Sequence, residues 1–131
     1  MVKLKQIMTK NPVKIDSGRT IREAINMMVE KKVGSVMVFN EKTGEIVGIL
    51  EESDIVRNVL AKDLNHYVVK VEQVMSVPFV IDEEKSDDEA SDLMSQKKVR
   101  HLAVASHSRI VGIVSMQDLI RPVYSGRSFW T

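Results

Sequence analysis

Two residues near the end of the chain, Ser115 and Asp118, have the types and the spacing that suit a phosphorylated ribose. They belong to the segment GIVSMQD (residues 112–118), in which an apolar run passes into a helical pattern. A hydroxyl there can donate to a phosphate oxygen, and the amides of a helix N-terminus attract phosphate. A carboxylate one turn later can accept from ribose hydroxyls. Gly112 would let a flat ring approach the backbone closely.

The same residues also have a purely structural explanation. Ser-x-x-Asp at the start of a helix forms a capping box, in which the hydroxyl accepts from the N3 amide and the carboxylate accepts from the N-cap amide. Gly112 then only relieves crowding in a strand. The heptapeptide alone leaves both explanations open.

The segment occurs twice in the chain. GILEESD (48–54) precedes GIVSMQD by 64 positions, with Gly48 matching Gly112 and Asp54 matching Asp118. Glu51, however, stands where the second copy has Ser115. The similarity continues outside the motif, where residues 2–16 match 69–82 and residues 22–39 match 88–105. A copy of about 60 residues buries little surface alone, so we expect the two copies to pack against each other.

Each copy predicts the order strand, helix, strand, strand, helix. The pattern indicates an α/β protein of the α+β type, made of two β-α-β-β-α repeats related by a pseudo-two-fold axis. Repeat 1 spans 1–60, a linker spans 61–68, repeat 2 spans 69–124 and a C-terminal tail spans 125–131. In the first copy, an extended run is predicted at Val13–Ile15. A helix is predicted to run from an N-cap at Thr20 to about Lys32, and Gly34 is predicted to end it. Strands are predicted at Ser35–Phe39 and Glu45–Leu50, and a second helix at Asp54–Leu60. In the second copy, the predicted elements are a helix at Asp87–Lys97, strands at His101–Ala105 and Arg109–Val114, and a helix at Met116–Ile120.

Composition narrows the classes of function. A net charge of +1 over 131 residues, with 44% hydrophobic and 28% charged residues, is typical of a soluble globular protein and argues against a nucleic-acid partner. The absence of cysteine excludes disulfides and thiolate catalysis. No apolar run reaches the roughly 18 residues of a membrane span, and the N-terminus has no signal-peptide pattern, so we expect a cytoplasmic protein. The acidic stretch Asp82–Asp92 lacks EF-hand spacing and the three histidines are scattered, so no metal site is predicted.

The element order, the leading IMTKNP segment and the repeated G-h-h-[ST]-x-x-D motif resemble the CBS domain. The two copies look like a tandem pair, the Bateman module, and the resemblance extends from Val2 to about Tyr124. It implies a regulatory module without enzymatic activity. Such a module binds an adenine nucleotide (AMP, ADP or ATP, with the need for Mg²⁺ open) in the cleft between the copies and signals by conformational change. Two alternatives stay open: a ligand-free dimerisation scaffold, and a sensor of S-adenosylmethionine-type ligands.

The resemblance also implies partners. It predicts a homodimer in which the helices at 21–32, 54–60, 87–97 and 116–122 pack across a two-fold axis. A further protein, which the sequence does not identify, would respond to the ligand. Phe129 and Trp130 in the tail have no counterpart in the first copy. We expect them to pack on the dimer. A contact with a partner is the second alternative, and the absence of a fixed structure is the third.

The resemblance carries two sets of ligand-binding residues onto the chain. In the first cleft, Gly112, Ser115 and Asp118 would face residues of the other copy, namely Ile15, Asp16, Ser17, Ala24, Val33, Gly34 and Ser35. In the second cleft, Glu51 and Asp54 would face Ile81, Asp82, Val99, Arg100 and His101. The apolar members also suit an ordinary core, and Gly34 suits a helix C′ position.

Glu51 makes the two clefts chemically unequal. A carboxylate about 4 Å from a phosphate costs roughly 1 kcal/mol in water and about 4 kcal/mol at an effective dielectric constant near 20. Glu51 could pair with Arg100 in an empty cleft, share the cleft with a ligand whose charge lies elsewhere, or point into solvent. We expect the first arrangement, and therefore about one nucleotide per chain.

Overall fold

The computed structural model describes the backbone of residues 1–125 and the side chains of residues 1–120, so the prediction for Phe129 and Trp130 lies outside the described residues. The chain forms two compact units. We call Pro12–Val77 the central unit, and Met1–Asn11 together with the chain from Pro78 onward the terminal unit.

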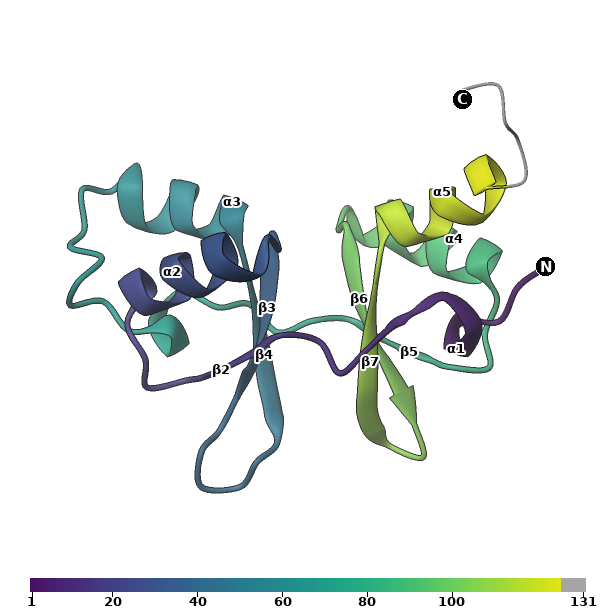
Figure 1. Ribbon diagram of the computed structural model, residues 1–131, viewed down its shortest axis with the longest axis horizontal. Coiled ribbons are helices and arrows are strands. Elements are labelled where there is room, and N and C mark those ends of the chain that lie inside the picture. Colours follow the sequence, from purple (N-terminus) through teal and green to yellow (C-terminus); the bar gives the residue numbers. More distant parts are fainter. Residues whose placement is uncertain (126–131) are drawn as a thin grey trace. The chain divides into compact units, whose positions relative to one another are not determined.

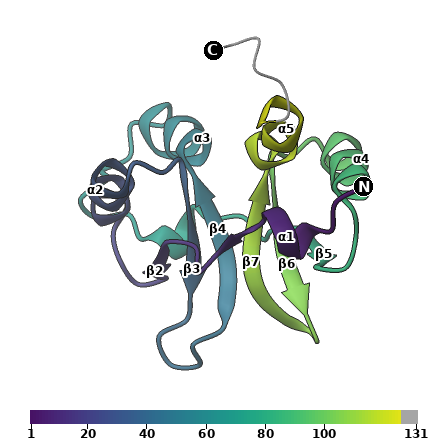
Figure 2. The same ribbon diagram turned by 45° about the vertical axis from the view of Figure 1, so that its right-hand side comes forward.

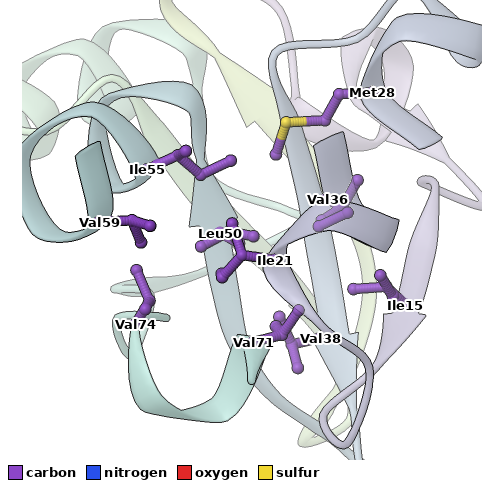
Figure 3. Packing of buried hydrophobic residues seen from close by; sticks show 11 residues of the cluster. Ile15, Ile21, Met28, Val36, Val38, Leu50, Ile55, Val59, Val71 and Val74 are labelled. Atoms are coloured by element: carbon purple, nitrogen blue, oxygen red, sulfur yellow. The ribbon is translucent and has the colours of Figure 1, made fainter. Parts of the chain in front are cut away.

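The central unit contains a three-stranded sheet in the order β2-β3-β4. Strand β2 (Lys14–Asp16) runs parallel to β3 (Ser35–Phe39), and β3 forms an antiparallel hairpin with β4 (Ile46–Glu51). Helix α2 (Ile21–Lys31) connects β2 to β3, and α3 (Glu52–Ile55) follows β4 and continues as a π-helical turn at Val56–Leu60. A 3₁₀ turn at Val71–Gln73 completes the unit. Figure 3 shows its core, where side chains from α2, α3 and the sheet surround Leu50.

Local sequence explains where α2 begins. The Thr20 hydroxyl oxygen accepts from the Glu23 amide at 3.2 Å, and the Glu23 carboxylate accepts from the Thr20 amide at 3.1 Å. This capping box satisfies two amides that a helix start leaves unpaired, and it confirms the predicted N-cap. Ile21, Ala24 and Met28 then face the core.

Helix α2 ends near Lys32, as predicted, but Gly34 is not the residue that ends it. Lys32, not Gly34, takes the left-handed conformation (φ 57°), and its amide donates to the carbonyl oxygens of Met28 and Val29. The equivalent Lys98 has the same conformation after α4. Gly34 instead has a φ outside the left-handed region, and its carbonyl oxygen accepts from the Glu52 amide at 3.0 Å. Gly34 was predicted to end the helix because glycine is favoured in the left-handed conformation. A lysine can also adopt this conformation at the end of a helix, at some cost in strain.

The terminal unit contains a four-stranded sheet in the order β1-β7-β6-β5. Its strands are β1 (Thr9–Lys10), β5 (Val80–Asp82), β6 (His101–Ser106) and β7 (Arg109–Ser115). Its helices are α1 (Leu4–Ile7), α4 (Asp87–Lys97) and α5 (Met116–Ser125), the last extending beyond the predicted end at Ile120. Ser86 caps α4 by accepting from the Glu89 amide at 3.1 Å. The mixed architecture confirms the predicted fold class.

The two units do not coincide with the two sequence repeats, because the leading segments are exchanged. Residues 2–11 begin the first repeat, yet they lie in the terminal unit, where β1 pairs with β7 (Figures 1 and 2). Residues 69–77 begin the second repeat, yet they lie in the central unit, where Ser76 bridges to Ile49. Leu4 and its repeat equivalent Val71 are both fully buried, each in the core of the unit that its segment joins. Each unit is therefore built from both repeats.

Candidate functional site

The N-terminus of α5 carries the motif from which the sequence predicted a ligand site. The Ser115 hydroxyl oxygen accepts from the Asp118 amide at 3.2 Å, and Asp118 Oδ2 accepts from the Ser115 amide at 2.8 Å. This is the capping box that the structural explanation required. Both residues therefore have a structural role, whether or not a ligand binds.

The capping box leaves chemistry available to a ligand. Ser115 Oγ uses a lone pair in the cap, so its proton can still be donated outward. The cap uses one oxygen of Asp118, and a carboxylate has a second oxygen that can accept. The Met116 amide, by contrast, already donates to the Arg100 carbonyl oxygen at 2.9 Å. The amides of residues 116 and 118 are thus occupied, and the helix contributes chiefly its dipole and these two side chains.

Two basic residues belong to the same corner of the terminal unit. In the antiparallel pairing of β6 with β7, His101 lies opposite Ser115. The hydrogen bond from the Met116 amide to the Arg100 carbonyl oxygen connects the residue before β6 to the start of α5. Arg100 and His101 are therefore close to Ser115 through the backbone. This set of groups suits a phosphorylated ribose.

The equivalent corner of the central unit is acidic. Ser35 lies opposite Glu51 in the β3–β4 register, and the Glu52 amide donates to the Gly34 carbonyl oxygen. Asp54 Oδ2 accepts from the Glu51 amide at 2.9 Å, and this bond is the equivalent of the one from the Ser115 amide to Asp118 Oδ2. Glu51, Glu52 and Asp54 thus stand where the terminal unit has Ser115, Met116 and Asp118, and residues 34 and 35 add no cation.

Partial burial raises the pKa of the Asp54 carboxyl group above its usual value. The hydrogen bond from the Glu51 amide opposes this shift, and the nearby Glu51 carboxylate adds to it. The nearby Arg57 guanidinium also opposes the rise in the pKa.

These neighbours refine the sequence analysis, which paired Gly34 and Ser35 with Ser115 and paired Arg100 and His101 with Glu51 across the copies. Within each unit the pairing is the reverse: residues 34–35 adjoin Glu51, and residues 100–101 adjoin Ser115. The cross-copy arrangement, including the Glu51–Arg100 pair, stays a prediction. The in-unit register places two basic residues, Arg100 and His101, beside Ser115 and none at the equivalent positions 34 and 35 beside Glu51.

The remaining predicted residues have structural roles. Ile15, Ala24 and Ile81 are buried, and Val33 and Val99 pack against the same cores. The Ser17 carbonyl oxygen accepts from the Glu72 amide at 3.1 Å, which holds the exchanged segment in the central unit. The carbonyl oxygen of Asp16 accepts from the Arg19 amide, and the carboxylate of Asp82 accepts from the Glu84 amide. A role for these residues towards a ligand stays a prediction.

Gly112 has a neighbour that the sequence analysis did not anticipate. A Cβ at this position would lie 2.7 Å from the Thr9 carbonyl oxygen and 2.9 Å from Met8 Sδ. A Cβ at Gly48 would likewise lie 2.5 Å from Met75 Sδ and 3.1 Å from the Ser76 carbonyl oxygen. The close approach is therefore made by the leading segments of the chain itself. The signal was present in the matching Met-Thr and Met-Ser pairs of the two repeats.

The central unit also has two cavities of about 450 Å³ each. One lies beside Gly34, between α2 and α3, and is mostly apolar. The other lies between β2 and α2 and is lined by charged residues, Asp16 among them, together with Ile15 and Phe39.

Among the described residues, no group of three or more His, Cys, Asp or Glu side chains could hold a metal ion. In the same part of the chain, no helix has the length and apolarity that a bilayer span requires.

Comparisons with a family model, with related sequences and with solved structures all point to the same family. The family model of the CBS domain matches residues 4–61 and 71–125. The CBS domain-containing protein YhcV of Bacillus subtilis is 31% identical over 120 residues, which is 91% of this chain and 84% of that protein. Uncharacterized proteins of Methanocaldococcus jannaschii and Methanopyrus kandleri are 29% and 35% identical, over 88% and 78% of this chain. The chain spans only 63% and 53% of their respective lengths.

Solved structures have the same fold. A conserved protein of Pyrococcus horikoshii has a TM-score of 0.87 at 28% identity, covering 99% of this chain and 96% of that one. A CBS domain protein of Pyrobaculum aerophilum, solved in complex with AMP, has a TM-score of 0.83 at 19% identity, covering 95% and 99%. A CBS domain pair in complex with 5′-methylthioadenosine and S-adenosyl-L-methionine has a TM-score of 0.84 at 24% identity, covering 97% and 99%.

Proposed function

The chain belongs to the CBS domain family as a tandem pair of repeats, and on that premise we propose that it is a regulatory module that binds an adenosine-containing ligand at the α5 corner of the terminal unit. Ser115 would donate to the 5′ substituent, Asp118 would accept from the ribose hydroxyls, and Arg100 and His101 would neutralise phosphate. The preferred ligand is an adenine nucleotide, AMP, ADP or ATP.

One observation carries this proposal: the β6–β7 register places His101 opposite Ser115, and the Arg100 carbonyl oxygen holds the first amide of α5. The two basic residues and the two residues proposed to bind ribose and phosphate therefore lie at one corner of the terminal unit. Relatives of the same fold bind AMP in one case and 5′-methylthioadenosine and S-adenosyl-L-methionine in another. The contributions of Ile15–Ser17, Ala24 and Val33–Ser35 from the other copy remain part of the proposal.

The mechanism is conformational and not catalytic. A ligand shifts the protein between two arrangements only by its difference in affinity for them. The change would be transmitted to a partner protein, and the chain itself would act as a homo-oligomer. A hexameric CBS protein among the solved relatives has a TM-score of 0.83 at 26% identity and supports assembly of this kind.

Isothermal titration of the purified protein with AMP, ATP and S-adenosylmethionine, each with and without Mg²⁺, tests the proposal. We expect saturable binding that Asp118→Ala abolishes and that the matched substitution Asp54→Ala in the central unit leaves in place. Arg100→Gly, which introduces the residue of the first repeat, should weaken AMP binding about 10- to 100-fold, the range of a charged hydrogen bond. It should weaken binding of uncharged 5′-methylthioadenosine much less.

A second candidate is a scaffold that binds no ligand. The capping box of Ser115 and Asp118 and the contact of Gly112 with Thr9 supply structural reasons for the whole motif. The same titration separates the candidates, because no heat with any adenosyl compound at millimolar concentration would support the scaffold and contradict the sensor.

A further inference from the structure

Two half-buried methionines lie where the leading segments of the repeats meet the sheets. Met8 and Met75 occupy equivalent positions in the two repeats, and each packs against the core of the unit that its segment joins. In each unit the side chain lies on the glycine of the repeated motif, since Met8 adjoins Gly112 and Met75 adjoins Gly48. The same contact therefore occurs in both units, between the leading segment of one repeat and a strand of the other.

The sulfur atom makes the closest side-chain approach in both contacts. A Cβ built on Gly112 would lie 2.9 Å from Met8 Sδ and 3.3 Å from Met8 Cγ. The corresponding distances at Gly48 are 2.5 Å to Met75 Sδ and 2.9 Å to Met75 Cγ. Between each sulfur and its glycine there is consequently no room for one further heavy atom.

Short backbone pairings hold the two segments beside these glycines. Strand β1 has two residues, Thr9 and Lys10, and both pair with β7. In the central unit Ser76 forms an isolated bridge with Ile49, in which each amide donates to the carbonyl oxygen of the other residue, at 3.0 and 2.8 Å. Each pairing begins directly after the methionine. A change at either sulfur would therefore act on a pairing of one or two residues, which opens more readily than a long ladder does.

The chain has eight methionines and no cysteine, so no thiol competes with the thioether sulfur atoms for an oxidant. A hydroperoxide converts methionine into its sulfoxide. A lone pair of the sulfur attacks the terminal peroxide oxygen, so that an S–O bond forms while the O–O bond breaks. The sulfur loses two electrons, and the leaving oxygen takes the proton and departs as water or an alcohol. The product is polar and chiral, and it disrupts apolar packing.

We propose that Met8 and Met75 are a pair of modification sites for hydroperoxides, at which oxidation releases the leading segment of each repeat from the sheet of its unit. The sulfoxide is larger and more polar than the thioether that each contact accommodates, and its oxygen has no space on the side of the glycine. Each unit then loses the segment that it takes from the other repeat. The inference goes beyond the proposed function and holds whether or not the α5 corner binds a ligand.

Titration of the full-length protein with hydrogen peroxide tests whether the two sites react. Mass spectrometry of tryptic peptides gives the oxygen gained at each methionine, with the exposed Met1 and the fully buried Met37 as internal references. We expect Met8 and Met75 to be oxidised at peroxide concentrations that convert Met1 and leave Met37 intact.

Hydrogen exchange then measures the release of the segments. The Leu4 amide, in the first leading segment, donates to a carbonyl oxygen before α4, and the Ile49 amide donates to a carbonyl oxygen of the second leading segment. Oxidation should accelerate exchange of both amides at least about 10-fold, as expected when a polar group enters an apolar contact. Met8→Leu should abolish the response of Leu4 alone, and Met75→Leu the response of Ile49 alone.

Met27 and Met116 provide the matched control. Both are half-buried and pack on the same two cores, but neither is among the nearest neighbours of Gly48 or Gly112. The double variant Met27→Leu/Met116→Leu should therefore keep the full wild-type response to peroxide. Protein with norleucine in place of every methionine keeps the shape of the side chain without the sulfur, so it should fold and should not respond. It also replaces the leucine variants if these do not fold.

Three results would overturn the proposal. The first is oxidation of Met8 and Met75 no faster than that of the buried Met37. The second is unchanged exchange at Leu4 and Ile49 in protein that carries sulfoxide at both sites. The third is acceleration by peroxide that persists in the protein containing norleucine.

Discussion

Gly112 and Thr9 are in direct backbone contact, so that a Cβ on Gly112 would stand 2.7 Å from the Thr9 carbonyl oxygen. The register agrees, because Lys10 lies opposite Gly112 and Thr9 opposite Ile113. The leading segment of the first repeat is thus fitted onto the motif of the second. Gly112, which the sequence analysis assigned to a ligand-binding motif, thus allows the leading segment of the first repeat to pack against the second repeat.

Gly112→Ala should therefore lower the free energy of unfolding by about 1–3 kcal/mol, the usual cost of forcing an extra carbon into a packed site. A backbone carbonyl within a paired strand cannot move aside as a side chain can. Urea denaturation followed by circular dichroism measures the change. Gly18→Ala is the control, because its Cβ would meet only Asp16 Oδ2, at an ordinary 3.6 Å. Equal stabilities of the two variants would contradict the argument.

Leu4→Ala should destabilise the terminal unit although Leu4 belongs to the first repeat. Leu4 is fully buried in the core of that unit, and truncating a buried leucine costs about 2–5 kcal/mol. Hydrogen exchange should show lost protection in α4 and β5–β7 before the central unit is affected. Val71→Ala should show the converse, with a smaller effect because a valine leaves a smaller cavity.

Met1→Ala is the control for this pair, since Met1 is almost fully exposed. If Leu4→Ala lowers protection in α2 and β2–β4 instead, the exchange of leading segments is wrong.

Glu51→Ser should create a second nucleotide site, provided that the proposed function holds. The wild-type protein should bind about one nucleotide per chain, because the corner around Glu51 has three acids and no basic residue at positions 34 and 35. Removing one carboxylate lowers the repulsion on a phosphate. The new site should still be weaker than the first, and Glu51→Ser combined with Ser35→His should strengthen it. Titration gives the stoichiometry, and a wild-type value of two would refute this asymmetry.

Asp54 should make stability depend on pH in the direction opposite to that of an ion-paired acid. Partial burial raises its pKa in the folded protein, so the folded state binds the proton more tightly than the unfolded state does. Its favourable contribution is complete below the unfolded value of 3.8 and is lost as pH rises through the folded pKa. Asp54→Asn keeps an oxygen that can accept from the Glu51 amide but carries no charge. Its stability relative to wild type should therefore be greater at pH 7 than at pH 4, as urea unfolding at the two pH values would measure. A difference that does not vary with pH would contradict the assignment.

Much of the architecture followed from the sequence by itself. The two repeats, α2 with its N-cap at Thr20, and α4 follow from the pattern of neighbouring residues. Side chains three and four positions apart decide whether a helix starts and which face it buries, so local pattern suffices. The capping box of Ser115 and Asp118 was predictable for the same reason.

Only the tertiary structure decided which segment joins which unit and which residues adjoin Ser115. Leu4 and Val71 occupy equivalent places in near-identical segments, and nothing local distinguishes the core that each enters. Strand register placed His101 beside Ser115 and Ser35 beside Glu51 within each unit, whereas the pairing across the copies stays a prediction. Such pairings depend on backbone hydrogen bonds and burial between residues far apart in the chain. The sequence thus determined the parts and their chemistry, whereas long-range packing decided which parts meet.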